Sequence, residues 1–171
     1  MPDFEHAPIK RHEALVPLSR DHFTGLVRAQ RLIKSTHEDR VARHKALAGF
    51  LDAWNSEIAA HFDDEERLFK GKISGEDEQR LLREHKEIRA LAKEAAEMRS
   101  SIDPSPERLK RIGVALRDHI RWEERELFGR VEASACEEQL NEMARETAKI
   151  EASRPRSKVY GQDAADSIED G

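Results

Sequence analysis

HFDDEERLF at residues 61–69 and HIRWEERELF at residues 119–128 are two copies of one phrase. Each copy holds a histidine and a glutamate four residues apart, His61 with Glu65 and His119 with Glu123. On a helix this spacing places both side chains on one face, one turn apart, and in both copies that face is also the apolar one. Burying histidine and glutamate is costly unless another group pairs with them. The doubled phrase therefore predicts a buried metal centre and favours two ions.

The composition favours a single helical domain. The chain has 171 residues, of which 38% are charged and 5% aromatic, and glycine and proline are scarce. Such a composition is typical of helical proteins. The net charge of −5 arises from interspersed acidic and basic residues, without the basic stripe of a nucleic-acid-binding protein.

The sequence shows no signal for membrane insertion or secretion. No apolar run approaches the roughly 18 residues that span a bilayer, and the N-terminus MPDFEHAPIKRHEALVP lacks the apolar stretch of a signal peptide. The single cysteine, Cys136, excludes an internal disulfide and a cysteine-based zinc site. We therefore expect a cytoplasmic protein that binds neither nucleic acid nor membranes.

Apolar residues recur every three or four positions in four long segments. Breaks at STHED (35–39), KGKISGED (70–77) and SSIDPSP (100–106) separate these segments. LSRDH (18–22) resembles LLREH (81–85), and each opens a pair of helices that one copy of the His…Glu-Glu-Arg phrase closes. A helical hairpin used twice predicts an all-α, up-down-up-down four-helix bundle.

The domain boundaries follow from the same pattern. Ser134 and Glu137 fit a capping box that would start a fifth helix. This helix is expected either to pack on the bundle or to form the contact of a homodimer. The expected order is an irregular lead-in at 1–14, the bundle at 15–131, an accessory helix at 134–152 and a disordered polar tail at 153–171.

Two further histidines, His22 and His85, lie on the apolar stripes of the other two bundle helices. In an antiparallel hairpin, residues at equal distances from the turn lie at the same height. The midpoint of His61 and His85 falls at residue 73 and that of His85 and His119 at residue 102, both inside breaks. The midpoint of His22 and His61 falls a few residues past the first break, an offset below one helical turn. All four histidines are thus predicted to lie in one layer.

Each of these residues alone has a simpler interpretation. Two copies of His-x-x-x-Glu are close to what chance gives in this glutamate-rich chain, and a single buried histidine is more often hydrogen-bonded or paired with an acid. Six ionisable groups in one layer, however, would need partners that they do not otherwise have. The metal ligands predicted in this way are His22, His61, Glu65, His85, His119 and Glu123.

Four imidazoles and two carboxylates form a nitrogen and oxygen donor set without thiolate. Such a set suits iron, manganese or zinc better than Ca²⁺ or Mg²⁺. If both carboxylates bridge, an added oxo or hydroxo bridge leaves one position open on each ion. Open positions on iron favour chemistry with O2, NO or peroxide. The Glu-x-x-His of ferritin-type sites and the His-Glu-x-x-His of zincins are absent from the sequence.

The order of these motifs resembles a known family. Four successive predicted helices carry, in order, a histidine, a His-x-x-x-Glu, a second single histidine and a second His-x-x-x-Glu. This order resembles the hemerythrin-like (HHE cation-binding) family over about residues 12–131. The resemblance implies two iron ions in a non-haem centre, with Glu65 and Glu123 as bridging carboxylates. It places His22 and His61 on one iron, and His85 and His119 on the other.

The chain departs from the oxygen-carrying hemerythrins of marine invertebrates. Those proteins have a second histidine where this chain has Arg89, and they bridge with an aspartate where it has Glu124. The four-histidine, two-glutamate set is more similar to bacterial HHE proteins, including di-iron proteins linked to iron–sulfur repair and nitrosative stress. The repair proteins carry an additional N-terminal domain with cysteines, which these residues lack. The resemblance therefore disfavours simple oxygen transport and weakens an assignment to repair.

Three functions remain open at this point. The first is a di-iron protein, not an enzyme, that binds or reacts with O2, NO or peroxide as a sensor, store or stress-defence protein; a sensor would need a protein partner. The second is a di-iron oxidase or peroxidase, or a repair protein that donates iron. The third is a structural metal site, with zinc, in an interaction module.

Residues beside the predicted ligands are given structural roles. Asp21, Glu84 and Asp118 each precede a histidine of the site by about 100° of helix rotation. We expect salt bridges for them, with a hydrogen bond to the imidazole of a neighbouring helix as the alternative. Surface ion pairs explain Glu66, Glu124, Arg67 and Arg125. Glu124 is the alternative bridging carboxylate if Glu123 does not bridge. Core positions are expected for Trp54 and Phe62, and positions at the bundle end for Phe69 and Phe128. The remaining histidines, His6, His12, His37 and His44, are predicted not to bind metal.

Overall fold

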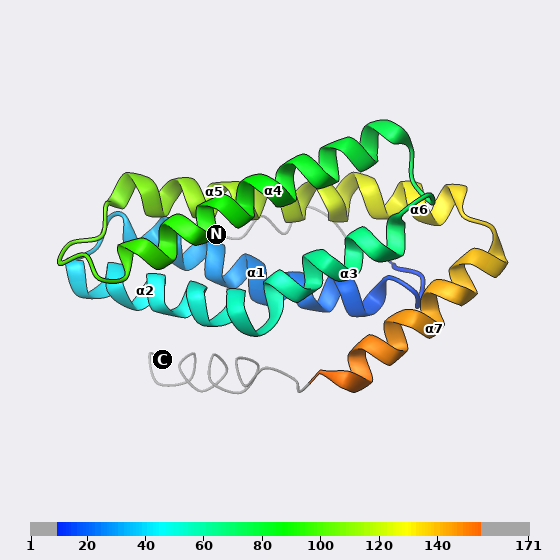
Figure 1. The fold of residues 1–171 in the computed structure, drawn as a ribbon, viewed down its shortest axis with the longest axis horizontal. Coiled ribbons are helices and arrows are strands. Elements are labelled where there is room, and N and C mark those ends of the chain that lie inside the picture. The colour runs from blue at the N-terminus through cyan, green and yellow to red at the C-terminus, as the bar shows by residue number, and fades with distance from the viewer. Residues whose placement is uncertain (1–9, 155–171) are drawn as a thin grey trace.

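Two helical hairpins form a four-helix bundle in the computed structural model, which describes residues 10–154 (Figure 1). The first hairpin pairs α1 (Val16–Ser35) with the rod made of α2 (Arg40–Ala53), η1 (Trp54–Ile58) and α3 (Ala59–Phe69). The second pairs α4 (Gly75–Met98) with the rod made of α5 (Pro106–Trp122), η2 (Glu123–Leu127) and α6 (Phe128–Ser134). Every regular element among the described residues is helical, which confirms the predicted all-α bundle.

The helices begin where the sequence supplies caps. The side chains of Asp39, Ser74 and Ser105 accept hydrogen bonds from backbone N–H groups in the first turns of α2, α4 and α5. Pro106 opens α5, at a position where its missing N–H costs nothing. Gly71, with a φ of 73°, follows the end of α3 in a conformation that favours glycine. The predicted breaks are therefore the observed turns.

Both rods contain one wider, π-helical turn, which the apolar pattern did not predict. In η1 the N–H of Ala59 donates to the carbonyl of Trp54, and in η2 the N–H of Phe128 donates to that of Glu123. Each bond spans five residues instead of four. Such single turns occur frequently at functional sites. Here η1 ends shortly before His61 and η2 begins at Glu123.

The apolar core consists of two clusters, one toward each end of the bundle. One cluster contains Leu32, Phe50, Ile88 and Leu116, and the other contains Leu18, Leu68, Leu81 and Leu127. On each bundle helix the predicted site histidine lies in sequence between residues of the two clusters. The layer of histidines is thus enclosed by apolar packing on both sides.

Helices α1 and α5 approach each other closely at two glycines. A Cβ atom on Gly113 would lie 2.7 Å from the carbonyl oxygen of Ala29, and one on Gly25 would lie 2.7 Å from the Cδ1 atom of Ile120. A larger side chain at Gly113 would separate the helices, whereas at Gly25 the end of the Ile120 side chain can move aside. The close approach brings His22, on α1, toward Glu123 at the end of α5.

The fifth helix, α7 (Glu137–Ser153), leaves the bundle end after α6 and folds back obliquely along α1 (Figure 1). The predicted capping box of Ser134 and Glu137 is wrong. Ser134 ends α6, where its hydroxyl donates to the carbonyl of Arg130, and Cys136 precedes α7, with its N–H bonded to the side chain of Gln139. The box is shifted because two residues are needed to turn the chain. The predictions for 1–9 and 155–171 lie outside the described residues.

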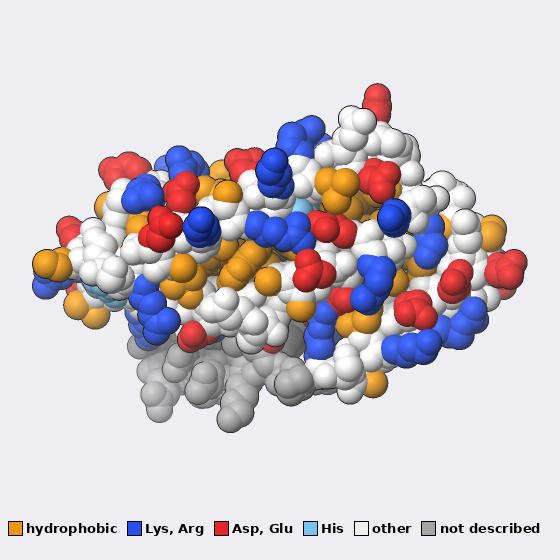
Figure 2. Space-filling model, in the orientation of Figure 1, with side chains coloured by type: hydrophobic (Ala, Val, Ile, Leu, Met, Phe, Trp, Pro, Cys, Tyr) orange, Lys and Arg blue, Asp and Glu red, His pale blue; other side chains and the backbone are white. Residues whose placement is uncertain are grey.

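The surface carries mixed charge. Figure 2 shows acidic and basic side chains interspersed across one face, as the sequence pattern predicts. Among residues 10–154, no helix is both long enough and apolar enough to cross a membrane.

Candidate metal centre

Six ionisable side chains meet in one buried layer of the bundle. They come from α1, α3, α4, α5 and η2, and the six residues are only 0–3% exposed. They are the four histidines that counting from the turns places at one height and the two glutamates one helical turn away: His22, His61, Glu65, His85, His119 and Glu123.

The two glutamates lie between the histidines. Glu65 Oε1 is 2.9 Å from His61 Nε2 and 3.4 Å from His22 Nε2, while its Oε2 is 3.3 Å from His85 Nε2. Oε1 of Glu65 therefore faces His22 and His61, and its Oε2 faces His85.

Glu123 spans the layer in the same way. Its Oε2 is 3.0 Å from His22 Nε2, and its Oε1 is 3.1 Å from His119 Nε2 and 3.8 Å from His85 Nε2. The layer thus divides into two groups of four ligand atoms. The atoms of each group lie within 4.8 Å of one another, and both groups include the two glutamates. One group contains His22 and His61, and the other contains His85 and His119.

The inner atoms of this layer have no hydrogen bond. All four histidine Nε2 atoms and all four glutamate oxygens are buried without a hydrogen-bond partner, although several are close enough for one. Buried polar atoms are nearly always satisfied in folded proteins. Eight unsatisfied atoms facing one another, four of them carboxylate oxygens, fit cations between them better than they fit an empty core.

The outer nitrogen of each histidine contacts a second carboxylate. These hydrogen bonds join Nδ1 of His22 to Glu124 at 2.7 Å, of His61 to Asp21 at 3.0 Å, of His85 to Glu66 at 2.8 Å and of His119 to Glu84 at 2.8 Å. An ionised carboxylate only accepts, so Nδ1 carries a hydrogen, and Nε2 is the atom that can bind a metal once its own proton is lost. This is how metal-binding histidines are commonly oriented.

Four of the structural roles expected for neighbouring residues are therefore incomplete. Asp21, Glu84, Glu66 and Glu124 each form a salt bridge with an arginine, but each also accepts from an imidazole of an adjacent helix. At these four positions the offset of about 100° from a ligand directs the side chain toward the next helix. Asp118 instead pairs with Arg117 at 2.9 Å, as expected.

A signal for these outer carboxylates was present in the repeat. Each is the sequence neighbour of one predicted ligand and accepts from a histidine on another helix. The pairs Asp21-His22 and Glu84-His85, together with the two Glu-Glu pairs at 65–66 and 123–124, recur in both hairpins. The repeat thus encodes the outer ring as well as the inner one.

Electrostatics keep the imidazoles protonated when no metal is bound. Burial alone lowers the pKa of His61, but the charge of Glu65 and the contacts with Asp21 and Glu65 outweigh it and raise this pKa to about 9. At His119, burial again lowers the pKa, but the charge of Glu123 and the contacts with Glu123 and Glu84 outweigh it and raise this pKa to about 9. For Glu65, burial raises the pKa, but the neighbouring imidazoles lower it well below the usual value.

Aromatic rings wall the layer. Phe62 stacks on His85 at 3.9 Å with an angle of 4°, and Phe128 stacks on His22 at 5.3 Å. Both residues are buried in the core, and Trp54 packs edge-on against Phe62 at 5.6 Å. The expected core position of Phe62 holds, and Phe62 has the further role of covering an imidazole. Trp54 is only partly buried and packs against the core.

A small cavity lies beside His22 and His61. It has a volume of about 10 Å³, room for about one water-sized molecule. Its wall is mainly apolar: Gly25, Ile58, Phe62, Leu116 and Ile120.

The remaining described histidines lie outside the layer. His12 accepts from the N–H of Ala14 at 3.1 Å, and His44 Nε2 lies 3.0 Å from the carbonyl oxygen of Ile102. His12, His37 and His44 are absent from both groups of candidate ligand atoms, whereas His6 lies outside the described residues. Arg89 also stays outside and pairs with Glu66 at 2.7 Å and Asp63 at 2.8 Å.

The fold and this layer define a helical-bundle protein with buried histidine and glutamate clusters compatible with metal binding. The sequence model of the hemerythrin HHE cation-binding domain matches residues 11–131. The chain therefore belongs to the hemerythrin HHE cation-binding domain family, as the order of its motifs indicated. Searches of curated proteins and of solved structures gave no significant match.

Proposed function

We propose that this chain binds two iron ions in the buried layer. Glu65 and Glu123 would bridge the ions, with His22 and His61 on one and His85 and His119 on the other. The observation that carries this proposal is the set of eight buried inner atoms without hydrogen bonds, divided into two groups that share both glutamates. The donor set of nitrogen and oxygen, without thiolate, suits iron, with manganese and zinc as the alternatives that metal analysis would reveal.

We further propose that the centre binds or reacts with O2, NO or peroxide as a sensor, store or stress-defence protein. The cavity of about 10 Å³ beside His22 and His61 supports a ligand of very few atoms. Its small size disfavours a bulky organic substrate, and so favours this function over that of an oxidase of organic molecules.

The residues of the chain would have distinct tasks. Bound iron would supply the redox chemistry. The outer carboxylates hold each Nδ1 hydrogen and so fix the direction of Nε2. Phe62 and Phe128 cover His85 and His22, and the apolar wall of the cavity keeps bulk water from the layer.

The proposed ligand binding is tested on iron-loaded protein under anaerobic conditions. Adding NO, O2 or hydrogen peroxide in separate titrations should give a saturable change in the visible absorption spectrum for at least one of them. A structural metal site predicts no change with any of the three, and that result would overturn the proposed ligand chemistry.

A variant of the cavity wall sharpens this test. Gly25→Ala places a methyl group 2.7 Å from Ile120 Cδ1 and takes up space in the cavity. It should weaken ligand binding by roughly tenfold without loss of iron, because one added carbon in an apolar pocket is worth about that much. Gly129→Ala, where an added Cβ meets nothing within 4 Å, is the matched control.

A further inference from the structure

Each outer carboxylate of the layer contacts an arginine. Arg89 lies 2.7 Å from Glu66, and Arg80 lies 2.7 Å from Glu84. Arg11 lies 3.1 Å from Glu124, and Arg154 lies 3.6 Å from Asp21. Every site histidine is therefore the first member of a chain that runs from imidazole to carboxylate to guanidinium.

The four arginines come from different parts of the molecule. Arg80 and Arg89 lie on α4, the bundle helix that also carries His85. Arg11 precedes α1, and Arg154 follows α7, so both stand on segments that flank the bundle. The half of the layer with His85 and His119 is thus completed within the bundle, whereas the half with His22 and His61 depends on the flanking segments.

The contact of Arg11 is well enclosed. Its side chain is 6% exposed, and Nε and Nη2 both lie against Glu124 Oε2, at 3.3 and 3.1 Å. Nη2 also donates to the backbone carbonyl of Glu124. The guanidinium lies 5.4 Å from the ring of Phe128, which itself stacks on His22. Arg11 therefore closes one side of the His22 environment.

Arg154 fastens the end of α7 to the bundle. It pairs with Asp21, the acceptor of His61, and with the buried Asp64. A second ion pair, Arg20 with Glu151 at 2.8 Å, holds the same end of α7.

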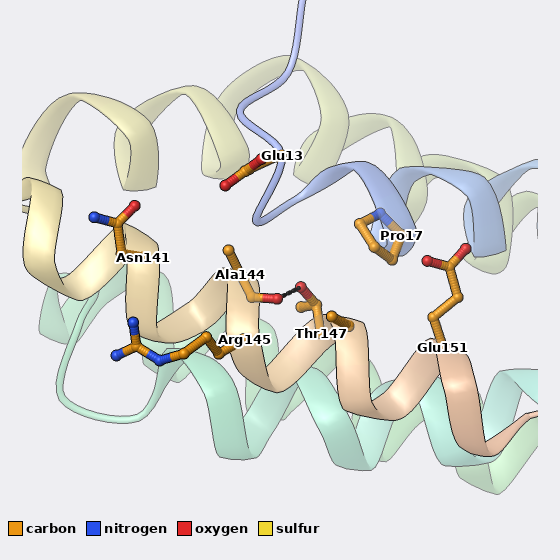
Figure 3. Close-up of a pocket in the computed structure, with 8 residues that line it drawn as sticks. Glu13, Pro17, Asn141, Ala144, Arg145, Thr147 and Glu151 are labelled. Atoms are coloured by element: carbon orange, nitrogen blue, oxygen red, sulfur yellow. Dashed lines mark hydrogen bonds between the residues drawn. The ribbon is translucent and has the colours of Figure 1, made fainter.

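The middle of α7 is separated from the start of α1 by a cleft of about 470 Å³. Figure 3 shows Pro17 and Glu151 toward one end of this cleft and Asn141 and Arg145 toward the other. Leu140, Met143 and Thr147 are buried on α7. The end of α7 near the layer is therefore held by the ion pairs of Arg20 and Arg154 as well as by the apolar contact of Ile150 with the core.

We propose that Arg11 and Arg154 are positioning residues for the metal held by His22 and His61, and that this metal position is coupled to the docking of α7. The proposal rests on the proposed metal site. Each arginine holds a carboxylate in place to accept the Nδ1 hydrogen, and that bond directs Nε2 to the metal. Coupling of this kind is reciprocal, so metal at this position stabilises the docked end of α7.

The first test compares Arg154→Gln with Arg20→Gln in the full chain. Both variants remove an ion pair that holds α7, but only the first removes the partner of Asp21. Titration with Co²⁺ against a chelator should show one of two sites weakened by roughly 5-fold or more in Arg154→Gln, with the other unchanged. Arg20→Gln should bind Co²⁺ like the wild type, and Arg154→Lys, which keeps the charge, should recover part of the loss. Equal binding by Arg154→Gln and Arg20→Gln would overturn the proposal.

The second test begins with the unmodified chain, whose response to metal does not depend on whether a variant folds. Hydrogen exchange of the backbone amides near the end of α7 should slow when Co²⁺ is added, and this response should be lost in Arg154→Gln but kept in Arg20→Gln and Arg80→Gln. Two bound Co²⁺ ions with unchanged exchange in α7 would overturn the coupling alone. A wild-type chain that binds no Co²⁺, iron, manganese or zinc would overturn the proposed function and this inference together.

Discussion

Each histidine of the layer presents its two ring nitrogens to different partners. Nδ1 donates to an outer carboxylate, and Nε2 faces the two shared glutamates. The direction of every imidazole is therefore fixed by a charged hydrogen bond as well as by packing. Such outer partners matter nearly as much as the ligands themselves for metal affinity.

The contribution of the outer carboxylates to metal affinity can be tested on Glu84 with Asp118 as its matched control, because each immediately precedes a site histidine. Glu84 accepts from His119, whereas Asp118 pairs only with Arg117 among the interactions described. Glu84→Ala should weaken binding of one metal ion by roughly 10–100-fold, and Asp118→Ala should leave it unchanged. A competitive metal titration measures both, and equal affinities for the two variants would contradict the role of the outer ring.

The sequence predicts the inner layer better than the outer ring. Counting residues from the turns places His22, His61, His85 and His119 at one height, and the structure brings them together; that they bind metal stays a prediction. For the outer carboxylates, which lie about 100° round the helix from a ligand, the sequence favours salt bridges, because the pattern does not say which helix stands beside a given face. Only the packing shows that Asp21 meets His61.

At the scale of helices, the closest packing is between α1 and α5. Gly113 allows it, because a Cβ there would lie 2.7 Å from the carbonyl of Ala29 and 2.8 Å from Ile33. Backbone atoms cannot move aside as a side-chain end can. The contact of His22 with Glu123 depends on this approach.

Gly113→Ala should therefore lower the free energy of unfolding by about 1–3 kcal/mol, the usual cost of overpacking. Gly129→Ala, in the open surroundings of α6, should be neutral or stabilising by up to about 1 kcal/mol, because alanine favours helix. Urea denaturation of the metal-free variants gives both values. Similar stability of the two variants would contradict the close α1–α5 contact.

The π turns show what the apolar pattern leaves out. The spacing from Leu47 to Leu68 alternates between four and three residues, which predicts an unbroken α-helix. At Trp54–Ile58 one backbone hydrogen bond encloses one more residue than in an α-helix, while apolar residues still fall on the buried side. Because the apolar residues already alternate between spacings of three and four, their pattern cannot reveal this π turn.

At the scale of the whole molecule, protons and metal compete for the same layer. The pKa values of His61 and His119 rise from 6.5 to about 9 in the metal-free protein, so their contribution to stability is complete below pH 6.5 and is lost as pH rises through 9. The pKa values of Glu66, Glu84 and Glu124 lie below 4.5, so their contribution is lost as pH falls below that value. Metal binding instead requires neutral imidazoles.

The melting temperature of the metal-free protein should thus fall between pH 6.5 and pH 9, while metal binding becomes stronger over the same range. The difference in melting temperature between metal-loaded and metal-free protein should widen as pH rises. Thermal unfolding of both forms at several pH values measures this difference. A difference that stays constant, or narrows, would contradict the competition between protons and metal.

Metal analysis of the iron-loaded chain shows whether two metal ions share Glu65 and Glu123. We expect two iron ions per chain in the wild type and loss of both when Glu65→Ala and Glu123→Ala are combined, because each glutamate faces both pairs of histidines. Full metal content in the double variant, or a wild type that binds no metal, would contradict the sharing of both glutamates.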